Sequence, residues 1–107
     1  MPRTIEEKIP DLTKVLRLVE AELLKAWTKH PNEFHNAHEG WAVLWEEVEE
    51  LWEEVKADTA YTKAGFKEAI QSAAMAVRFV VELHAHAKAD GSFSLANEYA
   101  SSFVTSR

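Results

Sequence analysis

Glutamates dominate one short segment, residues 44–55, where they alternate with apolar side chains. Glu47 and Glu50 stand three residues apart, a spacing that places their carboxylates one turn apart on the same side of a helix. From Glu39 to Asp58 there are eight acidic residues and one lysine, a net charge of −7, whereas the whole chain carries −6. Packed carboxylates repel one another, and a bound divalent cation would offset that repulsion. The segment therefore indicates a metal site built from carboxylate oxygens.

A second polar strip follows on the next apolar segment. On a helical wheel of about 100° per residue, Glu68 and Gln71 fall on this strip, together with Arg78 further along. If the two segments form antiparallel helices, Glu47 and Glu50 lie across a groove from the start of this strip. Such a cluster suits Mg²⁺ or Mn²⁺ with several waters retained and phosphate oxygens completing the shell. Arg78 can pair with an acid of its own helix or reach a phosphate.

The elements that must position these residues are helices. Few glycines and prolines and the helical spacing of apolar residues predict an all-α protein, a bundle of three main helices plus a short C-terminal helix, in a single domain over residues 1–107. Pro10 interrupts the capping box of Thr4 and Glu7, so the first helix is expected to start only near Asp11. The predicted helices span about residues 11–30, 36–56 and 62–90, with the short one inside 92–107.

The third predicted helix is apolar around most of its circumference, and such a helix must be covered on two sides. Because one chain of this size offers few elements to cover it, we expect the bundle to be completed by oligomerisation as a homodimer or homotetramer. The four tryptophans are interpreted mainly as core and interface anchors. Trp45 remains a candidate to line a pocket for a nucleobase.

Composition excludes several function classes. The absence of cysteine removes disulfides, thiolate metal sites and cysteine nucleophiles, and the net charge of −6 without a clustered basic face argues against nucleic-acid binding. No apolar run is long enough to cross a membrane, and the first residues lack a secretion signal, so a cytoplasmic protein is expected. Phosphate-binding loops, serine-hydrolase motifs and the Glu-x-x-His pairs of di-iron bundles are missing from the sequence. His35 and His38 are assigned capping or surface roles.

Two motifs carry a family resemblance. The segment Glu46-Glu47-Val48-Glu49-Glu50-Leu51 and the later segment Glu68-Ala69-Ile70-Gln71 resemble the paired E-x-x-E and E-x-x-D motifs of the MazG-like all-α nucleoside triphosphate pyrophosphohydrolases. The resemblance covers roughly residues 38–84. It implies helices from two chains packed into a bundle, four acidic residues holding magnesium, and attack of water on the α–β linkage of a nucleotide, with release of the monophosphate and pyrophosphate.

Carried over by position, the resemblance makes Glu47, Glu50 and Glu68 metal ligands, the first two also catalytic. Gln71 stands where the family has Asp, and its amide oxygen is a neutral, weaker ligand that cannot serve as a general base. Two functions therefore stay open: a Mg²⁺-dependent pyrophosphohydrolase, and a non-catalytic helical binding or assembly module on the same scaffold. The residues assigned to the nucleotide substrate are Gln71, Arg78 and Trp45.

Overall fold

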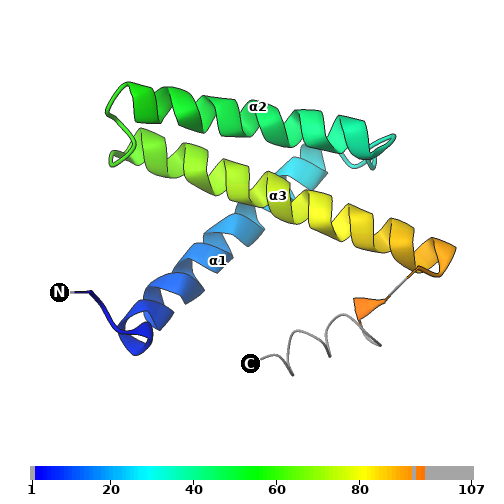
Figure 1. Cartoon of the computed structure of the whole chain (residues 1–107), viewed down its shortest axis with the longest axis horizontal. Coiled ribbons are helices and arrows are strands. Elements are labelled where there is room, and N and C mark those ends of the chain that lie inside the picture. The colour runs from blue at the N-terminus through cyan, green and yellow to red at the C-terminus, as the bar shows by residue number, and fades with distance from the viewer. Residues whose placement is uncertain (1, 93, 96–107) are drawn as a thin grey trace.

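The computed structural model describes residues 2–92, 94 and 95, and these form three helices (Figure 1). They are α1 (Ile5–Lys29), α2 (Ala37–Lys56) and α3 (Lys63–Asp90). α2 and α3 form an antiparallel hairpin, and α1 crosses α3 obliquely. The all-helical class and the three main helices are confirmed, whereas the predicted C-terminal helix falls largely outside the described residues.

α1 begins earlier than the sequence predicted. Thr4 and Glu7 form a complete capping box, in which the Thr4 hydroxyl accepts the Glu7 amide and the Glu7 carboxylate accepts the Thr4 amide. The helix then continues through Pro10 instead of starting after it. Proline removes a single intrahelical hydrogen bond here, the one to Glu6, and both residues are exposed, so water can satisfy the Glu6 carbonyl. The expectation of a start near Asp11 was therefore wrong.

The ends of α2 and α3 follow the predicted signals. The Asn36 side chain accepts the Glu39 amide at 2.9 Å and caps α2. Thr62 takes the extended N-cap conformation before α3, although its hydroxyl donates to the Thr59 carbonyl and not to the helix. α3 ends at Gly91, whose left-handed φ of 82° suits glycine. Only the short connection of residues 57–62 separates the two helices, which explains why they run antiparallel.

The buried interior of the chain is small. Val19 and Leu23 of α1 pack on Ile70 and Ala74 of α3, with other side chains partly buried around them. Many large apolar side chains remain exposed, among them Phe66, Val77, Val80, Val81 and Leu83 of α3 and Trp41, Trp45, Trp52 and Val55 of α2. The predicted apolar face of α3 is thus covered by α1 and α2 only in part. Within the described residues, no helix has the length and apolar composition needed to cross a bilayer.

The connection between α1 and α2 is held against α3 by one buried arginine. The Arg78 side chain is 6% exposed, and it pairs through Nε with Glu82 at 2.9 Å. Its Nη2 donates to the Asn32 carbonyl at 3.1 Å, and its guanidinium lies 4.3 Å from the centre of the Phe34 ring. Glu82 in turn accepts the Phe34 amide at 2.8 Å. Gly40 allows this close packing, because a Cβ there would lie 2.9 Å from the Phe34 ring.

Candidate metal centre

Three carboxylates from two helices converge on one point of the hairpin. Glu47 and Glu50 lie one turn apart on α2, and Glu68 faces them from the second turn of α3. Each offers an oxygen, and the three oxygens lie within 4.8 Å of one another. We call these residues the carboxylate cluster. Oxygens at this separation can bind one Mg²⁺ or Mn²⁺ after small side-chain adjustments, because metal–oxygen distances near 2.0–2.6 Å place ligands on opposite sides of an ion about 4–5 Å apart.

Two oxygens of the cluster are buried without a partner. The Oε2 atoms of Glu47 and Glu68 are inaccessible to solvent and, within the described part of the chain, receive no hydrogen bond. Buried polar atoms are almost always hydrogen-bonded, because leaving one unsatisfied costs about 1–3 kcal/mol. A cation bound by the cluster would give such oxygens a partner. This is a second feature pointing to a cation, independent of the clustering of acidic residues.

The electrostatics of the cluster agree with this geometry. Burial raises the pKa of Glu47 above its ordinary value, and the charges of Glu50 and Glu68 raise it further. Burial likewise raises the pKa of Glu68, with Glu50 adding to the shift and the neighbouring Lys67 opposing it. A divalent cation at the cluster would lower both pKa values, because a nearby positive charge favours the ionised carboxylate.

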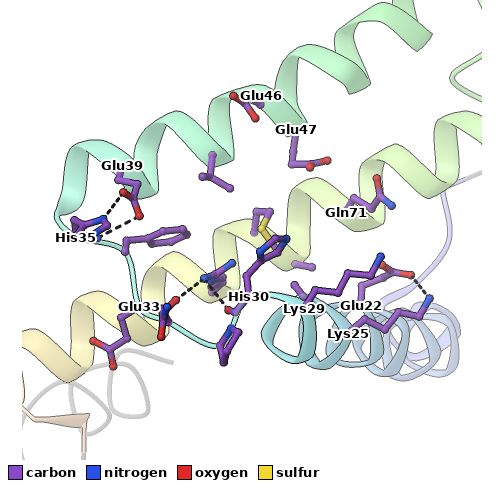
Figure 2. Close-up of a pocket in the computed structure, with 18 of the residues that line it drawn as sticks. Glu22, Lys25, Lys29, His30, Glu33, His35, Glu39, Glu46, Glu47 and Gln71 are labelled. Atoms are coloured by element: carbon purple, nitrogen blue, oxygen red, sulfur yellow. Dashed lines mark hydrogen bonds and ion pairs between the residues drawn. The ribbon is translucent and has the colours of Figure 1, made fainter.

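A cavity of about 800 Å³ opens beside the cluster, between α1, α2, α3 and the connection of residues 30–36 (Figure 2). Glu47 borders this cavity from α2, and Gln71 and Arg78 border it from α3. Its apolar lining includes Val43 and Met75. The volume lies within the range of small-molecule sites, about 300–1,000 Å³, and so is large enough for a nucleotide.

The sequence-predicted site residues fall into two groups. The carboxylates Glu47, Glu50 and Glu68 lie together, and Gln71 is one turn beyond Glu68 beside the same cavity. Of the three carboxylates, Glu47 lines the cavity, whereas Glu50 and Glu68 do not. Trp45 does not line it either; it stacks on Trp41 with ring centres 5.8 Å apart and is 48% exposed. Arg78 borders the cavity, but its described hydrogen bonds go to the 30–34 connection and Glu82.

Sequence reasoning missed the wall that α1 contributes. Lys25, Lys29 and His30, at the C-terminal end of α1, line the cavity opposite Gln71 and Glu47 (Figure 2). Lys67, directly before Glu68, also lines it. The position of Lys67 beside a predicted ligand was a usable signal. No pattern in the sequence indicated the α1 residues, because only the crossing of α1 over α3 brings them to the cavity.

Histidines near the start of α2 take the capping and surface roles expected of them. Exposed His35 donates its backbone amide to the Glu39 carboxylate at 3.2 Å, and its Nδ1 lies 2.7 Å from the same carboxylate.

Comparison of the chain with family models, with curated proteins and with solved structures finds no match. The case for a function therefore depends on the geometry of the site and on the motif resemblance.

Proposed function

We propose that the chain binds Mg²⁺, or Mn²⁺ in its place, at Glu47, Glu50 and Glu68 and hydrolyses a nucleoside triphosphate to the monophosphate and pyrophosphate. One observation carries the proposal: three carboxylates from neighbouring helices converge beside a nucleotide-sized cavity, and two of their oxygens are buried and unpartnered. The E-x-x-E motif with its second acidic helix agrees with the same reaction class.

The chemistry requires one water per turnover. Its oxygen forms a bond to phosphorus at the α–β anhydride, the bond to the bridging oxygen breaks, and pyrophosphate leaves with that electron pair. When bound, the cation supplies charge stabilisation on the phosphate oxygens. Glu47, Glu50 and Glu68 would hold the cation, and the exposed carboxylate of Glu50 would accept a proton from the attacking water. Gln71 is a neutral donor and acceptor at the edge of the site and binds phosphate or water.

The geometry gives Arg78 and Trp45, the other two residues assigned to the substrate, different roles. Arg78 supports the substrate cavity by fixing the 30–34 connection that forms one of its walls. Trp45 is exposed and is not part of the cavity lining, so a role in binding a nucleobase requires a cavity completed by another protomer. The proposed assembly is a homodimer or homotetramer that covers the exposed apolar faces of α2 and α3, and the proposed setting is the cytoplasm.

The test is a screen for pyrophosphate release across canonical and modified nucleoside triphosphates with Mg²⁺ and Mn²⁺. We expect at least one nucleotide to be cleaved by the wild type and the rate to fall about 100-fold or more for Glu50→Gln, since loss of even outer-shell support costs metal sites 10–100-fold. Glu49→Gln is the matched control, because Glu49 is exposed on the same helix and outside the cluster. Release that is equal in both variants would contradict the assignment.

A second function is favoured by a specific observation. Gln71 replaces the expected acidic ligand, and the exposed aromatic face of α2 is suited to an interface. The alternative is therefore a non-catalytic helical binding or assembly module on a MazG-like scaffold. An enzyme with a site weakened by Gln71 should gain pyrophosphate release on Gln71→Asp. The module should release none with any nucleotide, before or after that change.

A further inference from the structure

Two lysines from different helices border the cavity without an ion-pair partner. Lys29 lies in the last turn of α1 and Lys67 in the second turn of α3. Both line the cavity that Glu47 borders. In the described ranges of the chain neither forms a salt bridge, in contrast to Lys25, which pairs with Glu22 at 3.2 Å. Their two positive charges are thus available to a ligand.

The other charges around the cavity are mostly neutralised within the protein. Arg78 is paired with Glu82, Lys25 with Glu22, and His35 contacts Glu39. Three glutamates of the lining, Glu33, Glu46 and Glu47, form no salt bridge among the described residues. Glu46 and Glu47 stand on α2, and Figure 2 shows the α1 lysines on the opposite side of the gap, beyond Gln71. A ligand that spans the cavity from Glu47 would therefore meet the α1 lysines on the opposite side.

Lys67 borders the cavity from α3. It directly precedes Glu68 in the sequence, and it lines the cavity together with Glu47 and Gln71. A chain of phosphates bound to a cation at the cluster would extend past Gln71 toward Lys29. Lysine is a common phosphate ligand because its compact ammonium group has three donors and no acceptor.

We propose that Lys29 and Lys67 bind the phosphate chain of the ligand, so that the site selects polyphosphates over monophosphates. For the identity of the ligand this inference rests on the proposed function, which assigns the cation to Glu47, Glu50 and Glu68. It adds the anion-binding half of the site, which the acidic motifs do not contain. It also explains how a chain with a net charge of −6 can hold a polyanion.

The test uses inorganic tripolyphosphate as the probe, because it has the phosphate chain without a base or sugar. Its affinity is measured by calorimetry at saturating Mn²⁺ for the wild type and for the double variant Lys29→Gln, Lys67→Gln. The matched control is Lys14→Gln, Lys63→Gln, which removes one exposed lysine from α1 and one from α3, neither of them on the cavity lining. Both double variants have the same net charge, so long-range electrostatics cancel. Circular dichroism verifies that each is helical.

We expect the cavity variant to bind tripolyphosphate at least tenfold more weakly than the control variant and to lose much of the salt dependence of binding. Equal affinities of the two variants, or no binding by the wild type, would overturn the inference. A separate Mn²⁺ titration without phosphate tests the proposed function by itself. Mn²⁺ binding by all three proteins with equal tripolyphosphate affinities would refute the lysine role alone, and absence of Mn²⁺ binding by the wild type would refute the cation site.

Discussion

The Ser72 hydroxyl of α3 donates a hydrogen bond of 3.1 Å to the backbone carbonyl of Glu47 on α2. This bond joins the two helices at the level of the carboxylate cluster, one residue after Gln71. It fixes how far α3 can slide along α2, and therefore whether Glu68 faces Glu47 and Glu50. This partly buried serine, which no acidic motif includes, thus contributes to the register of the hairpin at the carboxylate cluster.

We expect removal of the Ser72 hydroxyl to affect Mn²⁺ affinity more than the stability of the fold. We expect Ser72→Ala to reduce Mn²⁺ affinity several-fold while the unfolding free energy falls by only about 0.5–1.5 kcal/mol, because a neutral hydrogen bond is lost and alanine favours the helix. Thr28→Ala is the control, since the Thr28 hydroxyl bonds a carbonyl of its own helix, Leu24, at 2.8 Å. Equal Mn²⁺ affinities of the two variants would show that Ser72 does not position the cluster.

The raised pKa values of Glu47 and Glu68 predict how stability depends on pH without metal. The unfolded chain releases these protons near its ordinary carboxyl pKa of 4.5, and the folded protein releases them only at higher pH. Between those pH values the folded state binds more protons, so these two groups lower the free energy of unfolding as pH rises through that window. Above the folded-state pKa values of both groups their full cost is present.

Glu68→Gln should therefore stabilise the metal-free protein at pH 7, and the gain should disappear at pH 4, where the wild-type carboxyl is protonated in both states. Urea unfolding of both proteins at the two pH values measures this. Glu49→Gln, at an exposed position outside the cluster, serves as the reference for removing one negative charge. A destabilising effect of Glu68→Gln at pH 7 would contradict the assigned burial.

We expect Arg78 to contribute more to the free energy of unfolding than to nucleotide binding. Its side chain is buried with Glu82, so Arg78→Met leaves an uncompensated buried carboxylate and should cost about 3–5 kcal/mol in unfolding free energy. The double variant Arg78→Met, Glu82→Gln should recover part of that loss, because glutamine still accepts the Phe34 amide without a charge. Urea titrations of the two variants and of Glu82→Gln measure the coupling. A stable Arg78→Met protein with impaired nucleotide binding would instead show that Arg78 binds the substrate directly.

Assembly of protomers is tested through the aromatic face of α2. We expect sedimentation to give two or four times the protomer mass of 12.2 kDa. Trp45→Glu should shift the protein toward the monomer, because Trp45 and its stacked neighbour Trp41 are 48% and 55% exposed. Lys14→Glu also introduces a carboxylate, at an exposed polar position of α1, and should leave the mass unchanged. A wild type that sediments at 12.2 kDa would contradict the predicted oligomer.

Local signals in the sequence predicted the hairpin well. Asn36 and Gly91 mark real ends of helices, and the spacing of Glu47, Glu50 and Glu68 brings them together because a short connection forces α2 and α3 to be antiparallel. These features depend on neighbours within a turn or on a six-residue connection, and such information is present in the local sequence.

What the sequence did not predict depends on long-range packing. α1 crosses α3 because Val19 and Leu23 pack on Ile70 and Ala74, and no local pattern sets the angle of that crossing. The cavity wall formed by Lys29 follows from it. The sequence placed Arg78 on a polar strip of the third helix, where it could pair with Glu82 or reach a phosphate, and the pairing with Glu82 is confirmed. The contacts with the connection between α1 and α2 that bury Arg78 were not predicted.

A Mn²⁺ titration followed by electron paramagnetic resonance tests whether carboxylates of two helices form one cation site. We expect the wild type and Glu49→Gln to bind Mn²⁺ alike, and Glu47→Gln and Glu50→Gln on α2 and Glu68→Gln on α3 each to weaken binding at least tenfold. Wild-type protein that binds no Mn²⁺, or a Glu68→Gln variant that binds it as tightly as the wild type, would show that the three carboxylates do not form such a site.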